Sequence, residues 1–296
     1  MFKQVILVGI LGIVLGCSSQ KQLIKAGSTP QLLADNFSFT EGPAADAAGN
    51  VYFTDQPNNR IHKWNATDGS ISVFMEDAGR ANGLYFDNDG NLLAAADNKS
   101  ELWKIAPDRS VQVLLTNFEG KRLNGPNDLW IAPNGTIYFT DPYYQRDYWE
   151  RTQKDIEAER VYALTRDGNV RIVAGDLVQP NGIIGTPDGK TLYVADIGAG
   201  KTYRYTLDSE GNLTNKQLFT EQGSDGMTLD SHGNVYLTGK GVTVYDKTGK
   251  KIEHINIDKD WTGNVTFGGK KRQTLFITAQ QGVYTLDMNV KGVRRY

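Results

Sequence analysis

Short segments of alternating apolar and polar residues, separated by turns, recur along the whole chain. The clearest are GNVYFTD (49–55), GNLLAAAD (90–97), GTIYFTD (135–141), GKTLYVAD (189–196), GNVYLTG (233–239) and RQTLFITA (272–279). Each follows a short apolar segment and a turn rich in Asp, Asn, Gly or Lys, so each pair predicts a β-hairpin. Their starting residues lie 39 to 54 positions apart, which indicates a repeated unit.

Two more strands follow the hairpin in most units. Third strands are predicted at IHKWN (61–65), ELWKIAP (101–107), VYALTRD (161–167), TYRYTLD (202–208), VTVYDKT (242–248) and GVYTLD (282–287). Fourth strands such as SISVFME (70–76) and SVQVLLT (110–116) follow them. Repeats of about 40 to 50 residues with four antiparallel strands are typical of propeller blades. We therefore predict an all-β, six-bladed β-propeller with four antiparallel strands per blade.

The two ends of the chain are expected to share one blade. The sixth unit lacks a fourth strand after residue 287, whereas QLLADNF (31–37) is similar to the fourth-strand segment VLLTNF (113–118). The N-terminal strand is thus predicted to complete the last blade, close the ring and hide the sheet edges. Residues 31–296 then form a single propeller domain.

Residues 1–17 predict an export signal. Lys3 precedes the apolar segment QVILVGILGIVLG (4–16), which is too short for a comfortable membrane span. The segment ends in VLGCSS (14–19), which resembles a bacterial lipobox and makes Cys17 the predicted lipidation site. Residues 18–30 are expected to be a polar tether. This predicts an exported, membrane-anchored lipoprotein facing the periplasm, with an ordinary secretory signal as the alternative.

Composition and charge narrow the possible partners. The chain has 32 Gly, 9 Pro, 14 Tyr and 11 Phe, a mixture of turn formers and aromatic residues that suits many short strands. Its formal net charge of -2 provides no basic surplus for binding nucleic acid. Cys17 is the only cysteine, so no disulfide can form within the chain. We expect a small-molecule ligand, no nucleic acid, and a monomer or weak oligomer.

One polar position repeats in register with the hairpins. Eight residues before each second-strand start stand Glu41, Asn82, Asn127, Asn181, Asp225 and Asn264. Equivalent positions in six blades converge on the channel axis, so these residues predict a ring of oxygen donors. Turn formation alone is the simpler explanation for an Asn before Gly. Two carboxylates in a narrow channel, however, require a positive charge between them, and such oxygens suit a hard cation such as Ca²⁺.

Six stretches in chain order also carry a family resemblance. They are FTEGPAAD (39–46), LNGPNDLWI (123–131), YFTDPYY (138–144), QPNGIIGTPDGKTLYVAD (179–196), GSDGMTLDSHGNVY (223–236) and GNVTFGG (263–269). They resemble the SMP-30/gluconolactonase/luciferin-regenerating-enzyme family over nearly all of residues 31–290. The resemblance implies one catalytic divalent metal, with Ca²⁺ expected and Mg²⁺, Mn²⁺ or Zn²⁺ as alternatives. The family's ligands fall on Glu41, Asn181 and Asp225, with Asn127 as a fourth ligand or a substrate contact.

The resemblance also implies a reaction. Members of the family hydrolyse lactones, so a sugar lactone such as gluconolactone is the expected substrate, with a metal-polarised carbonyl and an activated water. Asp225 has the implied catalytic role, either as the base or as the group that orients the water. Two alternatives remain open: hydrolysis of a phosphotriester or another ester at the same metal site, and a propeller that binds a ligand without catalysis.

Further candidate residues surround the predicted ring. Asp141 ends a second strand near the ring, and it is expected with Asn82 and Asn264 to support the ligands. The insertion PYYQRDYWERTQKDIEAER (142–160) offers Tyr143 and Tyr144 as a lid or a sugar-stacking wall, and its latter half predicts a short helix. Arg122 and Asn124 are candidate substrate contacts in the loop before Asn127.

Rival catalytic machinery is missing from the sequence. There is no G-x-S-x-G motif for a serine hydrolase. His62, His232 and His254 are expected on a third strand, in a hairpin turn and on an outer strand, away from the channel. A Ser-His-Asp triad or a histidine metal cluster is therefore not expected.

Overall fold

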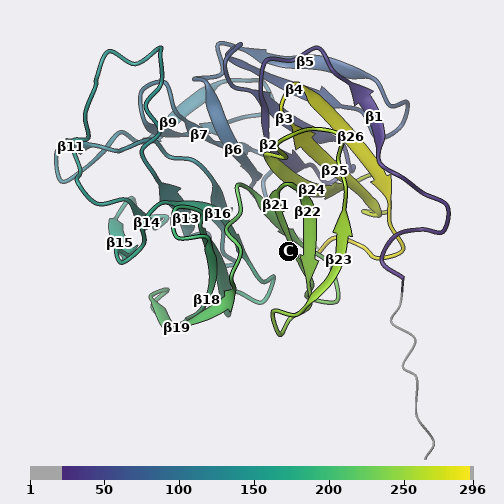
Figure 1. The fold of residues 1–296 in the computed structure, drawn as a ribbon. Helices are drawn as coiled ribbons and strands as arrows, with labels where there is room; N and C mark the ends of the chain where they lie inside the picture. Colours follow the sequence, from purple (N-terminus) through teal and green to yellow (C-terminus); the bar gives the residue numbers. More distant parts are fainter. Residues whose placement is uncertain (1–21, 294–296) are drawn as a thin grey trace, which may run out of the picture.

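The computed structural model describes residues 22–293, which form antiparallel sheets and no helix (Figure 1). Six four-stranded sheets follow one another along the chain. Their first strands contact one another in a closed ring, in which the first blade meets the second and the sixth. The predicted six-bladed β-propeller is confirmed. Within residues 22–293, no helix is long and apolar enough to cross a membrane.

The first three blades follow the predicted strand order. Blade 1 contains β2 (Thr40–Ala45), β3 (Val51–Asp55), β4 (Arg60–Trp64) and β5 (Ile71–Glu76). Blade 2 contains β6 (Ala81–Phe86), β7 (Leu92–Ala96), β8 (Glu101–Ile105) and β9 (Val111–Leu115). The short ribbon of β10 (Asn117–Phe118) and β11 (Lys121–Arg122) then precedes blade 3, which contains β12 (Leu129–Ile131), β13 (Ile137–Asp141), β14 (Arg160–Leu164) and β15 (Val170–Ala174).

The last three blades repeat this order. Blade 4 contains β16 (Pro180–Gly185), β17 (Thr191–Asp196), β18 (Lys201–Leu207) and β19 (Leu213–Thr220). Blade 5 contains β20 (Met227–Leu229), β21 (Val235–Gly239), β22 (Gly241–Tyr245) and β23 (Lys251–Ile255). Blade 6 contains β24 (Asn264–Gly268), β25 (Thr274–Ala279) and β26 (Gly282–Asp287), joined by β1 (Gln31–Ala34).

Side-chain hydrogen bonds fix the hairpin turns. In blade 1, the Asp46 carboxylate accepts from the backbone N–H of Asn50 at 2.9 Å and from its side-chain amide at 2.8 Å. Asp87 and Asn91 repeat the pair in blade 2. Gly49 in the first of these turns has φ +89°, a conformation that glycine adopts without strain. The Asp-x-x-Gly-Asn sequence therefore sets the register that the strands then follow.

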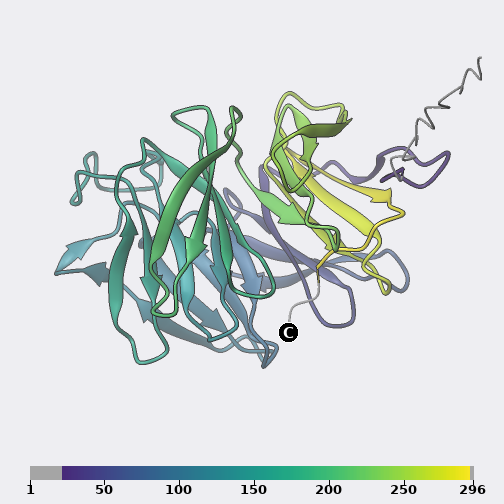
Figure 2. The same cartoon turned by 90° about the horizontal axis from the view of Figure 1, so that it is seen from below.

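The N-terminal strand closes the ring as predicted. β1 pairs antiparallel with β26, with Gln31 opposite Thr285 and Leu32 opposite Tyr284. Figure 2 shows the purple N-terminal residues beside the yellow C-terminal strands. The ring is thus closed by hydrogen bonds between the two ends of the described chain.

Part of the segment predicted as a polar tether (18–30) packs against the propeller. Leu23 is buried, and Ile24 forms a β-bridge with Met288. The Asn289 side chain donates hydrogen bonds to the carbonyls of Gln22 and Ile24, both at 3.0 Å. The apolar pair at 23–24 packs against blade 6, so part of the predicted tether (18–30) belongs to the propeller. The predicted signal peptide and Cys17 lie outside the described residues.

Aromatic residues fill the spaces between blades. Phe37, Phe53 and Phe276 pack where blade 1 meets blade 6. His62 lies on β4, where its ring stacks on Phe53 with centroids 5.3 Å apart. Burial lowers the pKa of His62, which suits a neutral core residue. The histidine lies on a third strand, as predicted, and is part of the core.

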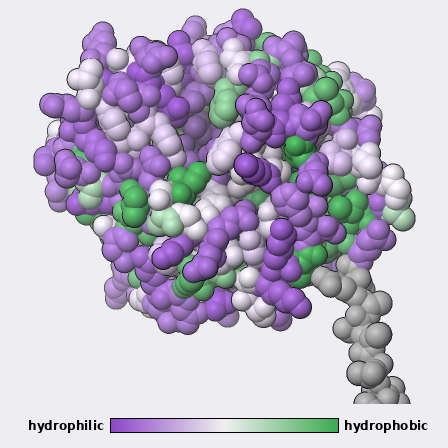
Figure 3. All heavy atoms as spheres, viewed as in Figure 1, coloured by the Kyte–Doolittle hydropathy of each residue, from purple (hydrophilic) through white to green (hydrophobic). Residues whose placement is uncertain are grey.

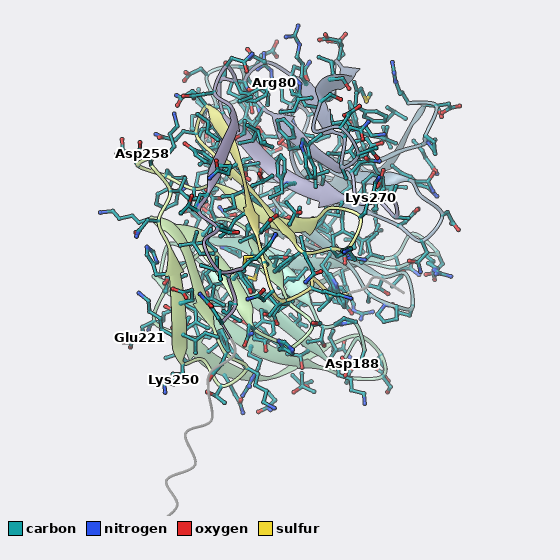
Figure 4. The ribbon with its side chains drawn as sticks, turned by 90° about the vertical axis from the view of Figure 1, so that its right-hand side faces the viewer. Arg80, Asp188, Glu221, Lys250, Asp258 and Lys270 are labelled. Atoms are coloured by element: carbon teal, nitrogen blue, oxygen red, sulfur yellow. The ribbon has the colours of Figure 1, made fainter. Side chains whose placement is uncertain are left out.

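The propeller has two unlike faces. In Figure 4, Asp258 and Glu221 lie on one side of the molecule, whereas Asp188 and Lys270 lie on the other. The C-terminal segment lines a narrow cavity of about 40 Å³ inside the channel. Val293 donates its backbone N–H to the Leu229 carbonyl there, at 3.2 Å.

Candidate functional site

Five of the six predicted ring residues line one cavity of about 150 Å³. They are Glu41, Asn82, Asn127, Asn181 and Asp225, and they are joined by Phe39, Gln56, Tyr144 and Arg146. Glu41 and Asp225, which are 184 positions apart in the chain, therefore meet at one place. The predicted convergence of the ring is confirmed for these five positions.

The inner strands position the ring residues. Glu41, Asn82 and Asn181 are each the second residue of a first strand, whereas Asn127 and Asp225 stand two residues before one. Close backbone packing between blades holds them near the axis. A Cβ on Gly42 would lie 2.0 Å from the Asn82 carbonyl oxygen, so the residue after Glu41 must be glycine. The glycines in this motif serve close approach as well as turn formation.

Threonines of the second strands fix the backbone of the next blade. Thr54 Oγ1 donates to the carbonyl of Asn82 at 3.0 Å. Thr140 Oγ1 donates to the carbonyl of Asn181 at 2.7 Å. These hydrogen bonds give a structural reason for the threonine in the repeated Phe-Thr-Asp sequence. The alternating pattern alone predicts only that this sequence is a strand.

Two carboxylates face the cavity together. Glu41 is 1% exposed and accepts a hydrogen bond from the Gly42 N–H at 3.0 Å. Burial raises the pKa of Glu41 well above its usual range, and the Asp225 carboxylate raises it further. Burial also raises the pKa of Asp225 to about 6, against the lowering effect of hydrogen bonds from Trp261 and Asn181. Two acids whose ionisation is unfavourable together form a site that a cation would stabilise.

Trp261 fixes one oxygen of Asp225. Its indole Nε1–H donates to Asp225 Oδ2 at 2.6 Å. Trp261 precedes β24, in the loop that leads into blade 6. This residue was not predicted from the sequence. It lies in an irregular loop, where no regular spacing indicates which side chains point toward the axis.

The amide of Asn181 leaves an oxygen available. Its Nδ2 donates to the Tyr144 hydroxyl at 2.9 Å, while its buried Oδ1 has no hydrogen-bond partner. An unpaired buried acceptor beside two carboxylates fits a hard cation, which binds carboxylate and amide oxygens. Among residues 22–293, no three His, Cys, Asp or Glu side chains gather as ligands. A cation here would therefore depend on amides as well as on Glu41 and Asp225.

Asn264 and Asp128 lie beneath this cavity. Both line the narrow cavity deeper in the channel, and the Asn264 side chain hydrogen-bonds to Glu41 and to Asp128. Burial raises the pKa of Asp128 to about 7. Asn264 thus contacts a predicted ligand from below, whereas Asn82 lines the upper cavity itself. The buried Asp128 follows Asn127 directly and was not singled out in the sequence.

The insertion between β13 and β14 reaches over the site. Tyr144 and Arg146 line the cavity. Asp97 of blade 2 anchors this segment: it accepts a hydrogen bond from the Tyr148 hydroxyl, forms an ion pair with Arg146 at 3.3 Å, and its carbonyl accepts from Trp149 Nε1 at 3.0 Å. The insertion therefore bridges two blades beside the cavity.

The predicted helix in the insertion is wrong. Residues 142–159 form turns and bends. Arg151 is drawn away from any helix by hydrogen bonds to the Leu123 carbonyl and to Ser100 Oγ, both at 2.9 Å. Contacts with blade 2 and with the loop before blade 3 outweigh the weak local preference for a helix.

Three predicted substrate contacts are placed elsewhere. Arg122 is exposed on β11. Asn124 is buried, and its amide donates to the Ala158 carbonyl at 3.3 Å. Tyr143 hydrogen-bonds to Gln145 and packs against Trp149, with ring centroids 5.7 Å apart. None of the three lines the cavity, because the loop before Asn127 and the start of the insertion are packed against each other.

Asp141 supports that loop instead of facing the cavity. Its carboxylate accepts the backbone N–H of Asn124 at 2.9 Å and of Gly125 at 2.8 Å. Burial raises the pKa of Asp141 to about 7 against these donors. A Cβ on Gly125 would lie 2.9 Å from Asp97 Oδ1 and 3.1 Å from the Trp149 ring. The loop thus fits tightly beneath the insertion.

Comparisons with known proteins agree with this fold. The model of the SMP-30/gluconolactonase/LRE-like region matches residues 39–281. A gluconolactonase from Zymomonas mobilis is 30% identical, over 86% of this chain and 80% of that protein. The structure of a gluconolactonase from Xanthomonas campestris has a TM-score of 0.82 at 28% identity, covering 90% and 91% of the two chains. A calcium-binding regucalcin from Agrobacterium tumefaciens shares the fold, with a TM-score of 0.75 at 21% identity over 90% and 96% of the chains.

Proposed function

Because the chain belongs to the SMP-30/gluconolactonase/LRE-like family, we propose that it is a metal-dependent hydrolase of sugar lactones such as gluconolactone. The observation that carries the proposal is the meeting of Glu41 and Asp225 with the unpaired Asn181 oxygen in one cavity. Similarity to gluconolactonases from two bacteria supports the enzyme class, a lactone hydrolase.

Glu41, Asn127, Asn181 and Asp225 would hold the cation. The choice of Ca²⁺ is supported by the hard oxygen ligands and by the calcium binding of the Agrobacterium regucalcin. When bound, a divalent ion would polarise the lactone carbonyl and stabilise the negative charge that develops on its oxygen. The remaining contributions come from this chain's own residues.

Asp225 is proposed to act on the attacking water. It is the partly exposed carboxylate of the pair and lines the cavity, and Trp261 fixes its Oδ2. A carboxylate that neighbours a cation is a weak base, so its main role is to orient the water. Glu41 is buried and contributes charge and a ligand oxygen. Asn82 and Gln56 also line the cavity and offer polar groups to the substrate.

Export is part of the proposal. Residues 1–17 have the features of a lipoprotein signal, so we propose a lipid anchor at Cys17 and a location facing the periplasm. The proposed partner is a small lactone.

The decisive experiment measures gluconolactone hydrolysis after thorough chelation and again after adding Ca²⁺, Mn²⁺, Mg²⁺ or Zn²⁺. We expect activity to disappear with chelation and to return with at least one ion. Glu41→Gln and Asp225→Asn should each reduce kcat by about 100-fold or more with folding unchanged. Glu76→Gln, which removes an exposed carboxylate paired with Arg60 at 2.7 Å, is the matched control.

The outcomes separate the alternatives. Hydrolysis that survives chelation would remove the metal mechanism. Faster hydrolysis of a phosphotriester such as paraoxon than of gluconolactone would favour the other ester substrate. Absence of hydrolysis with every ion and both substrates would leave only a ligand-binding propeller.

A further inference from the structure

Arg146 is the only cationic side chain among the described residues that line the cavity. It comes from the insertion, whereas the acids and amides come from the first strands of the blades or from the residues just before them. Its side chain is 25% exposed, so the guanidinium is reachable from the cavity while remaining largely covered. The lining therefore combines a cation from the insertion with acids and amides from the inner part of the blades.

Neighbouring side chains hold Arg146 in place. Asp97, whose side chain is 4% exposed, pairs with Nε at 3.3 Å. The guanidinium lies 5.4 Å from the centre of the Tyr144 ring. Asp97 is itself fixed by Tyr148, and the backbone beside it by Trp149. Arg146 donates no hydrogen bond to any other described residue, which leaves donors of its planar group available to a ligand.

The charge balance indicates what these donors recognise. Asp97 compensates the charge of Arg146, and a divalent ion would compensate Glu41 and Asp225. No surplus positive charge then remains to favour an anionic substituent. Hydroxyl groups, which accept hydrogen bonds from a guanidinium without bringing charge, match the arrangement better. The cavity of about 150 Å³ is smaller than the roughly 300 Å³ of the smallest drug-sized sites, which suits a single sugar ring.

Building on the proposed function, we propose that Arg146 is a specificity-determining residue that recognises the ring hydroxyls of an uncharged sugar lactone. Asp97 is the positioning residue that directs the guanidinium into the cavity. The site then selects polyhydroxylated lactones over plain ones through the insertion, whereas the residues of the inner strands act on the carbonyl end.

The test compares two lactones with the same six-membered ring, D-glucono-δ-lactone and the unsubstituted δ-valerolactone. Arg146→Met keeps the apolar stem and removes the donors. Its kcat/KM should fall about 10- to 100-fold on gluconolactone and stay within about 2-fold on valerolactone. Arg146→Lys should recover part of the loss. Asp97→Asn should also reduce the preference for gluconolactone over valerolactone, since the Arg146 guanidinium loses its ion-pair partner.

Arg80→Met is the matched control. The Arg80 guanidinium lies 4.2 Å above the Tyr148 ring and donates to the Pro57 carbonyl at 2.6 Å, yet it does not line the cavity. This variant should leave the ratio of kcat/KM on gluconolactone to kcat/KM on valerolactone unchanged. Calorimetric binding of 1,5-anhydro-D-glucitol, which has the ring hydroxyls but no carbonyl, should weaken at least tenfold in Arg146→Met and remain unchanged in Arg80→Met.

The failure of this inference is distinguishable from failure of the proposed function. If the wild-type protein hydrolyses neither lactone, the proposed function fails. A second outcome is that the wild-type protein is active on gluconolactone while Arg146→Met lowers kcat/KM equally on both lactones, or on neither. Arg146 then does not recognise hydroxyls. If the wild-type protein prefers 6-phospho-D-glucono-δ-lactone and loses that preference in Arg146→Met, the residue recognises an anion and the proposed hydroxyl recognition is overturned.

Discussion

Asn181 shows how a single amide prepares the cavity for a ligand. Tyr144 accepts a hydrogen bond from its side-chain nitrogen, while its buried side-chain oxygen has no hydrogen-bond partner. A buried acceptor without a partner costs about 1 to 3 kcal/mol of stability. Such a cost is expected where a structure is adapted to bind something rather than to be stable alone.

Trp261 is predicted to position Asp225 for the reaction. Trp261→Phe keeps an aromatic ring and removes only the N–H that donates at 2.6 Å. We expect lactone kcat to fall about tenfold, because the carboxylate loses its fixed orientation, with KM changed less. Steady-state kinetics on gluconolactone check this expectation.

The chain offers a closely matched control for that substitution. Trp103 Nε1 also donates to a carboxylate at 2.6 Å, that of Glu101, but on β8 outside the cavity lining. Trp103→Phe should leave kcat unchanged. Equal effects of the two substitutions would show that Trp261 acts through stability alone.

Ring residues could be predicted well from the sequence, and loop residues poorly. Glu41 and Asp225 were found because equivalent positions of repeated units face one axis. Arg146 lines the cavity and Trp261 donates to Asp225, but both stand in irregular segments whose paths depend on contacts between blades. The same limitation explains why Asn124 and Tyr143, though near Asn127 or Tyr144 in sequence, point elsewhere.

At the level of elements, the insertion and the closing strand behave differently. β1 was predicted correctly because its apolar pattern matches the fourth strands of other blades, and pairing with β26 needs only that pattern. The insertion has no counterpart in the other blades. Its conformation follows from contacts outside the insertion. Arg146 pairs with Asp97 of blade 2, and Arg151 hydrogen-bonds to Ser100 of blade 2 and to Leu123 in the loop before blade 3.

The closing strand β1 is predicted to stabilise the protein through the face that packs between blades 1 and 6. Leu33 packs with the cluster that includes Phe53 and Phe276, whereas its neighbour Leu32 is 50% exposed. Leu33→Ser should lower the free energy of unfolding by about 1 to 3 kcal/mol, and Leu32→Ser by less than about 0.5 kcal/mol. Urea denaturation of the two variants measures both values. Equal effects would mean that closure does not depend on packing between blades 1 and 6.

For the whole molecule, repetition made the fold predictable. Six copies of one turn and strand pattern predict the same blade six times, and an error in one unit leaves the others intact. On the face in Figure 3, apolar residues are scattered among polar ones. Among residues 22–293, the large exposed hydrophobic residues are Leu32, Val73, Val111, Val113, Ile172, Val178 and Leu218. Most stand on the outer strands of different blades, so an assembly no larger than a weak oligomer remains our prediction.

Stability of the metal-free protein is predicted to decrease as the pH rises from 6 to 8. Burial raises the pKa of Asp128 from 3.8 to about 7 and that of Asp225 from 3.8 to about 6. The folded state therefore binds these protons more tightly than the unfolded chain does, and it loses this stabilisation as each group ionises.

Urea midpoints in EDTA at pH 6 and pH 8 test this sign. Asp128→Asn cannot ionise, so its midpoint should depend less on pH than that of the wild-type protein. Added Ca²⁺ should restore more stability at pH 8 than at pH 6, since the ion competes with the protons of Glu41 and Asp225. A midpoint that rises with pH in EDTA would contradict the prediction.

The close fit of Gly125 beneath Trp149 and Asp97 restricts how this propeller can be redesigned. A larger residue at that position would collide with the insertion, and a different insertion would leave the glycine loop uncovered. Substrate preference therefore cannot be transplanted by exchanging either segment alone. A graft between homologous scaffolds would have to carry both, together with the aspartate of the adjoining blade that links them.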